Sequence, residues 1–370
     1  MLPLKKWILV GITFLSQFSV AEELFEYQRP ISAMGMGGVF VPFIKDTDAV
    51  IWNPAALGFT KEITWEIMNV GAGANASSDL ATAFSQMSQS GSFASLYGQN
   101  FWLGYQGKTS FAAPRLGFAG FNFGYVGGAL HTPSYPTFDM TLINDYGFTA
   151  GTAFMLSNYT SVGIAVKRIN RWGGPQSLGL SLISGGDSTA ILNQFQNRGY
   201  AYGFDLAMMA QGESGPWKTS AALVWQDVGM TSFVKEAGTA PPPMIHDNMT
   251  AALGAAMDLP GFDFKGGLEY RHMLLSGEQF GKKVHLGVEF GLPMFDVRAG
   301  LNQGYTTYGI GTSILFMDLD IASYTEEVGI YPGQTGDQRI EFGLSMSLGV
   351  DADFKFTAKD GKRRKLKQRR

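Results

Sequence analysis

The residues that could do chemistry gather close to the start of the chain. Three glycines, Gly35, Gly37 and Gly38, are followed by the two carboxylates of Asp46 and Asp48. A glycine-rich loop could cradle a phosphate, and paired carboxylates could bind a metal ion or act as acid and base. However, no third glycine follows at the spacing of a dinucleotide fingerprint, and the remaining ligands and loop glycine of a calcium site are missing. We therefore expect neither a phosphate site nor a metal site.

The histidines give no clearer indication of catalysis. The chain has four, His131, His246, His272 and His285, and it has no cysteine and no His-x-x-x-His spacing for zinc. A membrane-embedded hydrolase would need a serine or aspartate beside a histidine, and His131, at the end of a predicted strand, is the one candidate. We expect no enzyme, no metal and no cofactor.

The chain begins with the features of a secretory signal peptide. Lys5 and Lys6 precede an apolar run from Trp7 to Phe18, and a small-residue cleavage site ends at Ala21. The run is shorter than the ~20 residues of a spanning helix, so we expect residues 1–21 to be removed on export. Without a cysteine after the cut, a lipid anchor is excluded.

Composition narrows the fold class. The chain has 48 glycines and 28 phenylalanines, and 16% of its residues are charged. No later stretch approaches the ~20 consecutive apolar residues of a membrane helix, which excludes a helical membrane protein. A large all-β fold or a transmembrane barrel remains.

From residue 64 onward the sequence repeats about ten residues of alternating character and then a turn. In residues 339–350 apolar side chains occupy every second position and small or polar ones the others, which is typical of a strand with one apolar face. Short connections (108–112, 157–160, 212–215, 260–261, 293, 316–318) alternate with mostly longer ones (74–97, 172–200, 229–247, 274–282, 329–338), as in an outer-membrane barrel. We predict a transmembrane antiparallel β-barrel of 14 strands: 64–73, 98–107, 113–130, 138–156, 161–171, 201–211, 217–228, 248–258, 262–273, 283–291, 294–302, 307–315, 319–328 and 339–350.

The polar face of these strands would line a lumen if the apolar face meets lipid. Three neighbouring predicted strands then place these ionisable side chains inside: Lys265, Glu269, Arg271, His285, Glu289, Asp296 and Arg298. Because an unpaired charge is costly there, we expect these side chains to pair with one another within the wall. A substrate relay is the alternative.

One predicted strand, 113–130, breaks the alternation near Gly120, since Leu116 and Phe121 have opposite parity. A slip of one residue reverses every later side chain unless a bulge absorbs it, so Gly117 and Gly120 are candidates for a kink or gap in the wall. The alternative is a strand that is apolar on both faces and packs against a plug.

Two long connections and the C-terminal end differ from ordinary loops in composition. Residues 78–95 are predicted to form a short amphipathic helix. Residues 177–195 are apolar for a loop in water, which indicates contact with lipid, ligand or partner, or loops that fold over each other. Residues 359–370 hold eight lysines and arginines. We expect 357–370 to be a disordered periplasmic tail that meets anionic headgroups, cell-wall material or an acidic partner, and not nucleic acid.

The opening stretch resembles the N-terminal signature of the FadL-type outer-membrane proteins and their PorV-like relatives. Gly35-Met36-Gly37-Gly38, Asp46-x-x-Ala49 and Asn53-Pro54-Ala55-x-Leu57 are similar to the family pattern Met-Gly-Gly, Asp-x-x-Ala and Asn-Pro-Ala-x-Leu. Over the rest of the chain the resemblance is one of strand layout, with Val297 to Gly300 leaning toward the PorV-like branch. It implies a 14-stranded barrel at 63–356 whose N-terminal residues 22–62 fold inward as a hatch.

The resemblance also implies a function. FadL-type proteins imply passive uptake of hydrophobic small molecules, such as long-chain fatty acids, across a Gram-negative outer membrane, past the hatch and with a wall gap as a lateral exit. The PorV-like branch implies instead an accessory barrel that binds exported proteins or a secretion machine without transport. We expect Asp46 and Asp48 to cap turns or to pair with basic side chains of the lumen such as Arg271 or Arg298. The expected partners are membrane lipid and either a hydrophobic ligand or an exported protein, and the sequence indicates no oligomeric state.

Overall fold

A computed structural model of the chain describes residues 26, 29–77, 82, 85–86, 93–131, 137–179, 182, 188–314 and 316–351. The predicted signal peptide (1–21) and basic tail (357–370) lie outside these residues, as does most of the predicted helix at 78–95.

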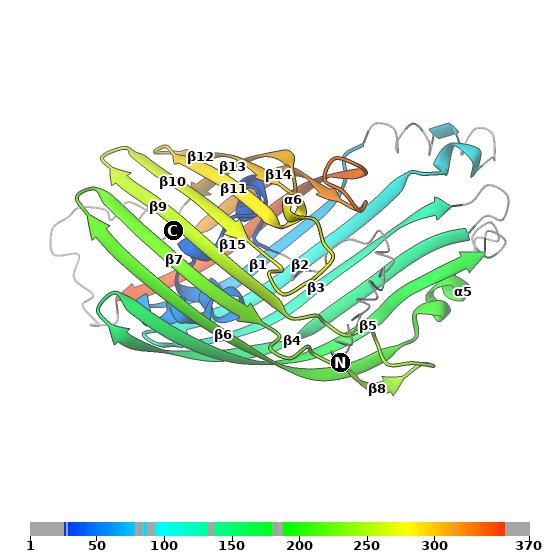
Figure 1. Ribbon diagram of the computed structural model, residues 1–370, viewed down its shortest axis with the longest axis horizontal. Coiled ribbons are helices and arrows are strands. Elements are labelled where there is room, and N and C mark those ends of the chain that lie inside the picture. The colour runs from blue at the N-terminus through cyan, green and yellow to red at the C-terminus, as the bar shows by residue number, and fades with distance from the viewer. Residues whose placement is uncertain are drawn as a thin grey trace, which may run out of the picture.

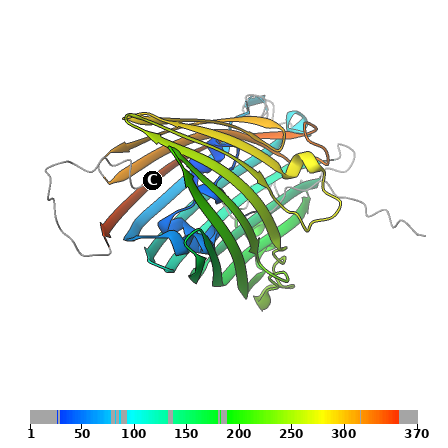
Figure 2. The ribbon, with the colours of Figure 1, turned by 60° about the vertical axis from the view of Figure 1, so that its left-hand side comes forward.

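The chain forms one closed antiparallel sheet of 14 strands, called the ring below (Figures 1 and 2). Successive ring strands pair along the chain, β5 pairs with β6, and β1 closes the ring by pairing with β15. The remaining strand, β8 (Val234–Ala237), pairs only with the first residues of β6. The ring strands are β1 (Glu62–Asn75), β2 (Asn100–Ala113), β3 (Leu116–His131), β4 (Thr137–Ser157), β5 (Thr160–Gly179), β6 (Arg198–Ser214), β7 (Trp217–Gln226), β9 (Asn248–Leu259), β10 (Phe262–Tyr270), β11 (Val284–Gly291), β12 (Phe295–Asn302), β13 (Tyr305–Ile314), β14 (Met317–Glu327) and β15 (Gly336–Asp351).

The predicted fold class and strand number are confirmed, and the differences lie at strand ends. Residues 108–112, predicted as a turn, belong to β2, and the turn is Pro114-Arg115. The alternation simply continues, because Lys108 and Ser110 are buried while Phe111 is exposed. Arg115 adopts a positive φ of 69° that suits a tight turn.

The outer face of the ring is apolar and exposed. Along β5, for example, Ile164 and Val166 are exposed, while Gly163, Ala165 and Lys167 between and beside them are buried. A closed sheet satisfies every backbone group internally, so an apolar outer face allows it to lie in lipid. In the part of the chain that the structure describes, no helix has the length and apolar character needed to span a membrane.

Of the two alternatives for the third strand, the structure fits the strand that is apolar on both faces. β3 pairs with β2 and β4 without a register shift through both Gly117 and Gly120. The parity change has another cause, because the strand is apolar on both faces: Phe118 is exposed outward and Phe121 is buried inward. A Cβ on Gly117 would lie 2.8 Å from the Cβ of Val50, so the inner face packs against the start of the chain.

Residues 29–61, called the N-terminal segment below, lie within the ring, where both views place the dark blue ribbon (Figures 1 and 2). The segment contains short helices that turn it repeatedly: α1 (Ile31–Gly35), η1 (Val41–Phe43), η2 (Asp46–Asp48), α2 (Ala49–Trp52) and η3 (Pro54–Phe59). The long connections contain η4 (Phe93–Leu96), α5 (Ser188–Leu192), η5 (Asn193–Phe195) and α6 (Phe280–Lys283). Most of the largest core cluster comes from the N-terminal segment and the inward side chains of β2 to β7.

Candidate functional site

The glycines of the N-terminal segment touch the backbone of the wall. A Cβ on Gly35 would lie 2.7 Å from the Cα of Gly309, and a Cβ on Gly37 would lie 2.2 Å from the carbonyl oxygen of Leu286. The wall also supplies glycine, since a Cβ on Gly300 would lie 2.4 Å from the nitrogen of Gly37. Backbones approach this closely only where side chains are missing on both sides. The role of these glycines is therefore close packing.

Hydrogen bonds fix the same glycines. The Gly37 N–H donates to Thr307 Oγ1 at 2.8 Å, and the Thr307 hydroxyl donates to the Gly35 carbonyl oxygen at 3.0 Å. His285 lies 3.2 Å from the Gly37 carbonyl oxygen through Nδ1, which fits a neutral ring that carries its proton on that nitrogen. The other nitrogen, Nε2, is buried with no partner among the described residues. His285 thus positions the glycine stretch.

Glu269 attaches the next residues to β10. Its Oε1 accepts hydrogen bonds from the backbone N–H groups of Phe40 at 2.5 Å and Val41 at 2.6 Å. Its Oε2 accepts from Arg271 Nε at 2.8 Å and from Arg29 Nη1 at 3.2 Å. The carboxylate is completely buried, so these charge-assisted bonds replace its lost hydration.

Glu26 completes this group of charges. It lies 2.9 Å from Arg29 Nε, 3.1 Å from Arg271 Nη1 and 2.9 Å from His272 Nε2. Burial alone would raise the pKa of Glu26, but Arg271 and Arg29 outweigh it and hold the pKa well below its usual value. These charges join the residues before α1 to β10 and to the residues that follow it. They are called the anchor cluster below, which consists of Glu26, Arg29, Glu269, Arg271 and His272.

The other expected lumen charges also point inward and pair. Glu289 lies 2.7 Å from Lys265 Nζ and 2.6 Å from Arg298 Nε. Arg298 then reaches Asp320 at 2.6 Å and Asp296 at 3.6 Å. These residues form a chain of ion pairs across β10 to β14, an arrangement that satisfies the buried charges from within the wall.

Asp48 pairs with a basic side chain of the lumen, but this is Lys108 and not Arg271 or Arg298. Asp48 and Glu66 both pair with the Lys108 ammonium, and Ser110 donates to Glu66 at 2.8 Å. Burial raises the pKa of Asp48, although Lys108 opposes the rise.

The reason is geometric, because η2 packs against β1 and β2, whereas Arg271 and Arg298 follow β10 and lie on β12. Asp46 instead turns the backbone with a positive φ of 53°. Sequence reasoning missed Lys108 because it placed that residue in a turn.

The Asn-Pro-Ala sequence faces the opposite side of the ring from the glycine stretch. Asn53 is completely buried, and its Nδ2 donates to the Val41 carbonyl oxygen at 3.3 Å, which joins two parts of the N-terminal segment. Pro54 and Ala55 lie against Gly163 of β5, where a Cβ would come within 2.2 Å of the Pro54 carbonyl carbon. Only a glycine in the wall leaves room for this turn.

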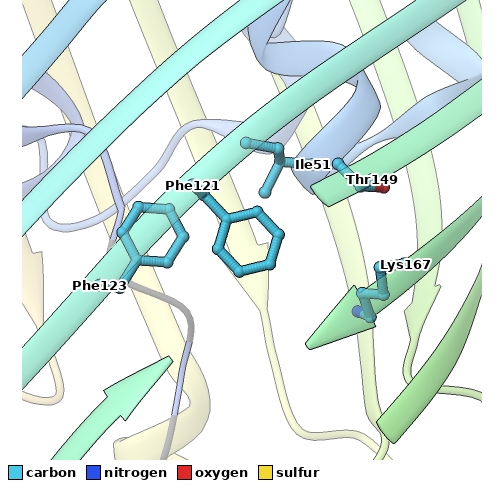
Figure 3. A pocket seen from close by; sticks show the side chains of 5 residues that line it. All are labelled: Ile51, Phe121, Phe123, Thr149 and Lys167. Atoms are coloured by element: carbon cyan, nitrogen blue, oxygen red, sulfur yellow. The ribbon is translucent and has the colours of Figure 1, made fainter. Parts of the chain in front are cut away.

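An apolar recess lies between α2 and the wall. Its volume is about 10 Å³, room for one water molecule, and it is lined by Ile51, Phe121, Phe123, Thr149 and Lys167 (Figure 3). The rings of Phe121 and Phe123 are stacked with centroids 5.2 Å apart. One feature of the sequence pointed to this recess: the change in the parity of apolar residues along β3, which places both rings on its inner face. Ile51 comes from far away in the chain and could not have been assigned to it.

Lys167 supplies the polar end of the recess, and its charge is already balanced. Its Nζ lies 2.8 Å from Asp205 Oδ1 and 2.9 Å from Asp227 Oδ2. Thr231 Oγ1 donates to Asp227 at 2.6 Å, and the Asp227 N–H donates to Asp205 at 2.8 Å. One ammonium among two carboxylates leaves a net negative cluster, which does not attract an anionic ligand.

In the part of the chain that the structure describes, the side chains that could hold a metal ion are dispersed. Groups of three or more His, Cys, Asp and Glu side chains placed to hold a metal ion are not found among these residues. His131 is the last residue of β3.

No protein-family model matches the sequence, and neither does any curated protein. Among solved structures, the chain is similar to the CymD monoaromatic hydrocarbon channel, with 11% identity and a TM-score of 0.48 over 90% of this chain and 99% of that one. It is similar to the Pseudomonas putida toluene transporter TodX, with 10% identity and a TM-score of 0.48 over 89% and 100%. A Pseudomonas aeruginosa FadL homologue matches at 10% identity and a TM-score of 0.38 over 88% and 98%. At these identities and TM-scores the likeness concerns the barrel fold alone: the chain is similar in fold to FadL-type and hydrocarbon-channel barrels.

Proposed function

We propose that the chain lies in a Gram-negative outer membrane and allows small hydrophobic molecules to pass through its barrel without an energy source. The observation that carries the proposal is the apolar recess between Ile51 of the N-terminal segment and Phe121 and Phe123 of the wall. The exposed apolar outer face of the ring supports the membrane location.

In this proposal residues 22–62, which include the N-terminal segment, act as a hatch. Its two halves are held differently. The first half is tied to the wall at the glycine stretch by Thr307 and at Phe40 and Val41 by the buried carboxylate of Glu269, and these directional bonds resist displacement. The half that contains α2 and η3 packs mainly through apolar side chains such as Val50 and Leu57, and its carbonyl oxygens accept two hydrogen bonds from the wall, from Gln226 Nε2 to Ile51 at 3.1 Å and from the Arg115 N–H to Leu57 at 3.1 Å. This half lacks a buried carboxylate anchor like Glu269, so in this proposal it shifts and enlarges the recess while the other half stays in place.

The ligands that fit best are neutral. A molecule in the recess would meet two phenylalanine rings and an isoleucine, and at its polar end a lysine already paired with Asp205 and Asp227. A carboxylate placed there would meet net negative charge and would lose its hydration without a free cation in return. Long-chain fatty acids, the ligand class implied by the resemblance, are therefore the poorer fit within the hydrophobic class.

Uptake by cells with and without the gene tests this proposal. Radiolabelled naphthalene, a neutral ligand, should enter faster when the gene is present, and labelled oleate should show a smaller gene-dependent gain. Equal naphthalene uptake with and without the gene would reject the transport proposal. If a protein partner also remained bound through a mild-detergent pull-down, that pair of results would support the accessory-barrel alternative.

A further inference from the structure

The outer face of the ring carries two arginines close together on neighbouring strands. They are Arg168 of β5 and Arg198 of β6, the strands coloured green in Figure 1. The other lysines and arginines of the described ring strands share the parity of the buried, inward-facing residues. Among the described residues, no carboxylate lies within ion-pair distance of either arginine. Two uncompensated cations on an otherwise apolar face require an explanation, because a charge that faces lipid is costly.

The neighbours of Arg168 show that it points outward. The residues on either side of it, Lys167 and Ile169, are 4% and 0% exposed. Its cross-strand partners, Phe148 on β4 and Tyr202 on β6, are 46% and 66% exposed. Side chains of directly paired residues share a face of the sheet, so the guanidinium lies on the outside.

Aromatic rings hold both guanidinium groups. The Arg168 guanidinium carbon lies 5.5 Å from the ring centroid of Tyr200, and that of Arg198 lies 5.6 Å from the ring centroid of Trp172. Trp172 is the cross-strand partner of Arg198. These cation–π contacts restrict the flexible side chains. The Nε of Arg168 is buried, so a ligand would reach that guanidinium through its terminal nitrogens. The donors are therefore arranged before any ligand arrives, which reduces the entropy lost on binding.

Their height in the wall matches the edge of a membrane. β5 begins at Thr160 beside a tight turn, and Arg168 follows after eight residues, about 27 Å along the strand and about 19 Å in height at a tilt of 45°. Arg198 pairs with Trp172, four residues further on, at about 29 Å. The apolar band of such barrels is about 25 Å tall, so a band that begins at the tight turn places the two arginines on either side of its outer boundary. Ile164 and Val166, below them, face lipid.

We propose that Arg168 and Arg198 bind the phosphate groups of anionic lipid headgroups in the outer leaflet. The planar guanidinium presents paired N–H donors that match a phosphate, and two arginines without counter-charges favour an anionic lipid over a zwitterionic one. The inference rests on the membrane location proposed above and is independent of transport. It extends the lipid contact of this barrel from a general apolar surface to a defined site.

Lipid titration of the purified full chain in a neutral detergent tests this site. Phosphatidylglycerol is the anionic probe, phosphatidylcholine the zwitterionic one, and native mass spectrometry reports how many lipids stay bound. The wild type should retain phosphatidylglycerol preferentially. Arg168→Gln and Arg198→Gln should each weaken its binding roughly tenfold, equivalent to about 1.4 kcal/mol. Arg168→Lys should recover only part of the loss, because an ammonium lacks the planar fork.

A matched control removes equal charge elsewhere. Lys61 and Arg115 are exposed at the tight-turn end, and Lys61→Gln with Arg115→Gln changes the net charge as much as the double arginine variant does. Equal loss of phosphatidylglycerol in both double variants would overturn the proposal, as would displacement of the lipid by an equal concentration of inorganic phosphate. The Arg168→Gln/Arg198→Gln variant should keep gene-dependent naphthalene uptake, so a failure of the lipid site and a failure of transport are distinguishable.

Discussion

Replacing Glu269 with alanine should release the N-terminal segment from the wall. The change leaves the N–H groups of Phe40 and Val41 without their acceptor, and it leaves Arg29 and Arg271 with one carboxylate, Glu26, between them. Removing one partner from a buried ion pair costs about 3–5 kcal/mol. Because Glu26 remains, we expect the low end, about 3 kcal/mol, which favours the displaced segment by roughly 150-fold.

A single introduced cysteine reports this release, because the chain has none of its own. Thr47 is 8% exposed, and Thr47→Cys conserves its size, so a maleimide should react with it slowly while the segment stays in place. When opening and closing are fast, the reaction rate follows the equilibrium fraction of displaced segment. Thr47→Cys/Glu269→Ala should therefore react about two orders of magnitude faster than Thr47→Cys alone.

The control for this prediction is Glu236→Ala in the same cysteine background, since Glu236 is exposed on β8. It should react at the parent rate. Glu269→Gln keeps an acceptor for the backbone N–H groups but loses the charge, and it should fall between the parent and Glu269→Ala. Equal rates for Glu269→Ala and the parent would show that the anchor cluster does not hold the segment.

Further predictions use the same Thr47→Cys background or the wild-type chain. Gly300→Ala should accelerate maleimide reaction, because its Cβ would lie 2.4 Å from the Gly37 nitrogen, whereas Gly107→Ala, with its nearest neighbour at 3.9 Å, should not; equal acceleration by both would contradict the packing role. Lys108→Met should lower the thermal unfolding midpoint, since it leaves Asp48 and Glu66 buried without their cation, and an unchanged midpoint would refute that role. Because the folded state lowers the pKa of Glu26, its stabilising contribution is complete above the unfolded pKa of about 4.3 and is lost as pH falls further. The mobile fraction of a spin label attached to the Thr47→Cys variant should rise below about pH 4, and a flat profile into strong acid would contradict this.

The strands could be predicted from the sequence because lipid outside and polar groups inside impose strict alternation. β15, with apolar residues at every second position from Ile340, shows how direct that signal is. The signal weakened where the inner face is also apolar. β3 meets lipid through Phe118 and the N-terminal segment through Phe121, so its parity change resembled a bulge.

The partners of the charged side chains were harder to predict than the strands. Parity shows that Lys265 and Glu289 face inward on neighbouring strands, where pairing is local. It does not show where a segment that crosses the lumen will lie, so the pairing of Asp48 with Lys108 needed the path of the chain in space. The recess could not be predicted for the same reason, since one of its walls is Ile51 of the N-terminal segment, whose path in space parity does not give.

Naphthalene uptake by cells that carry a filled recess tests the central claim most directly. Ile51→Trp places a larger side chain in the space between α2 and β3, and Phe118→Trp makes a change of similar chemistry on the outward face of β3. We predict that Ile51→Trp lowers uptake to the level of cells without the gene and that Phe118→Trp leaves it at the wild-type level, with both barrels folded. Wild-type uptake by Ile51→Trp would contradict passage through the recess.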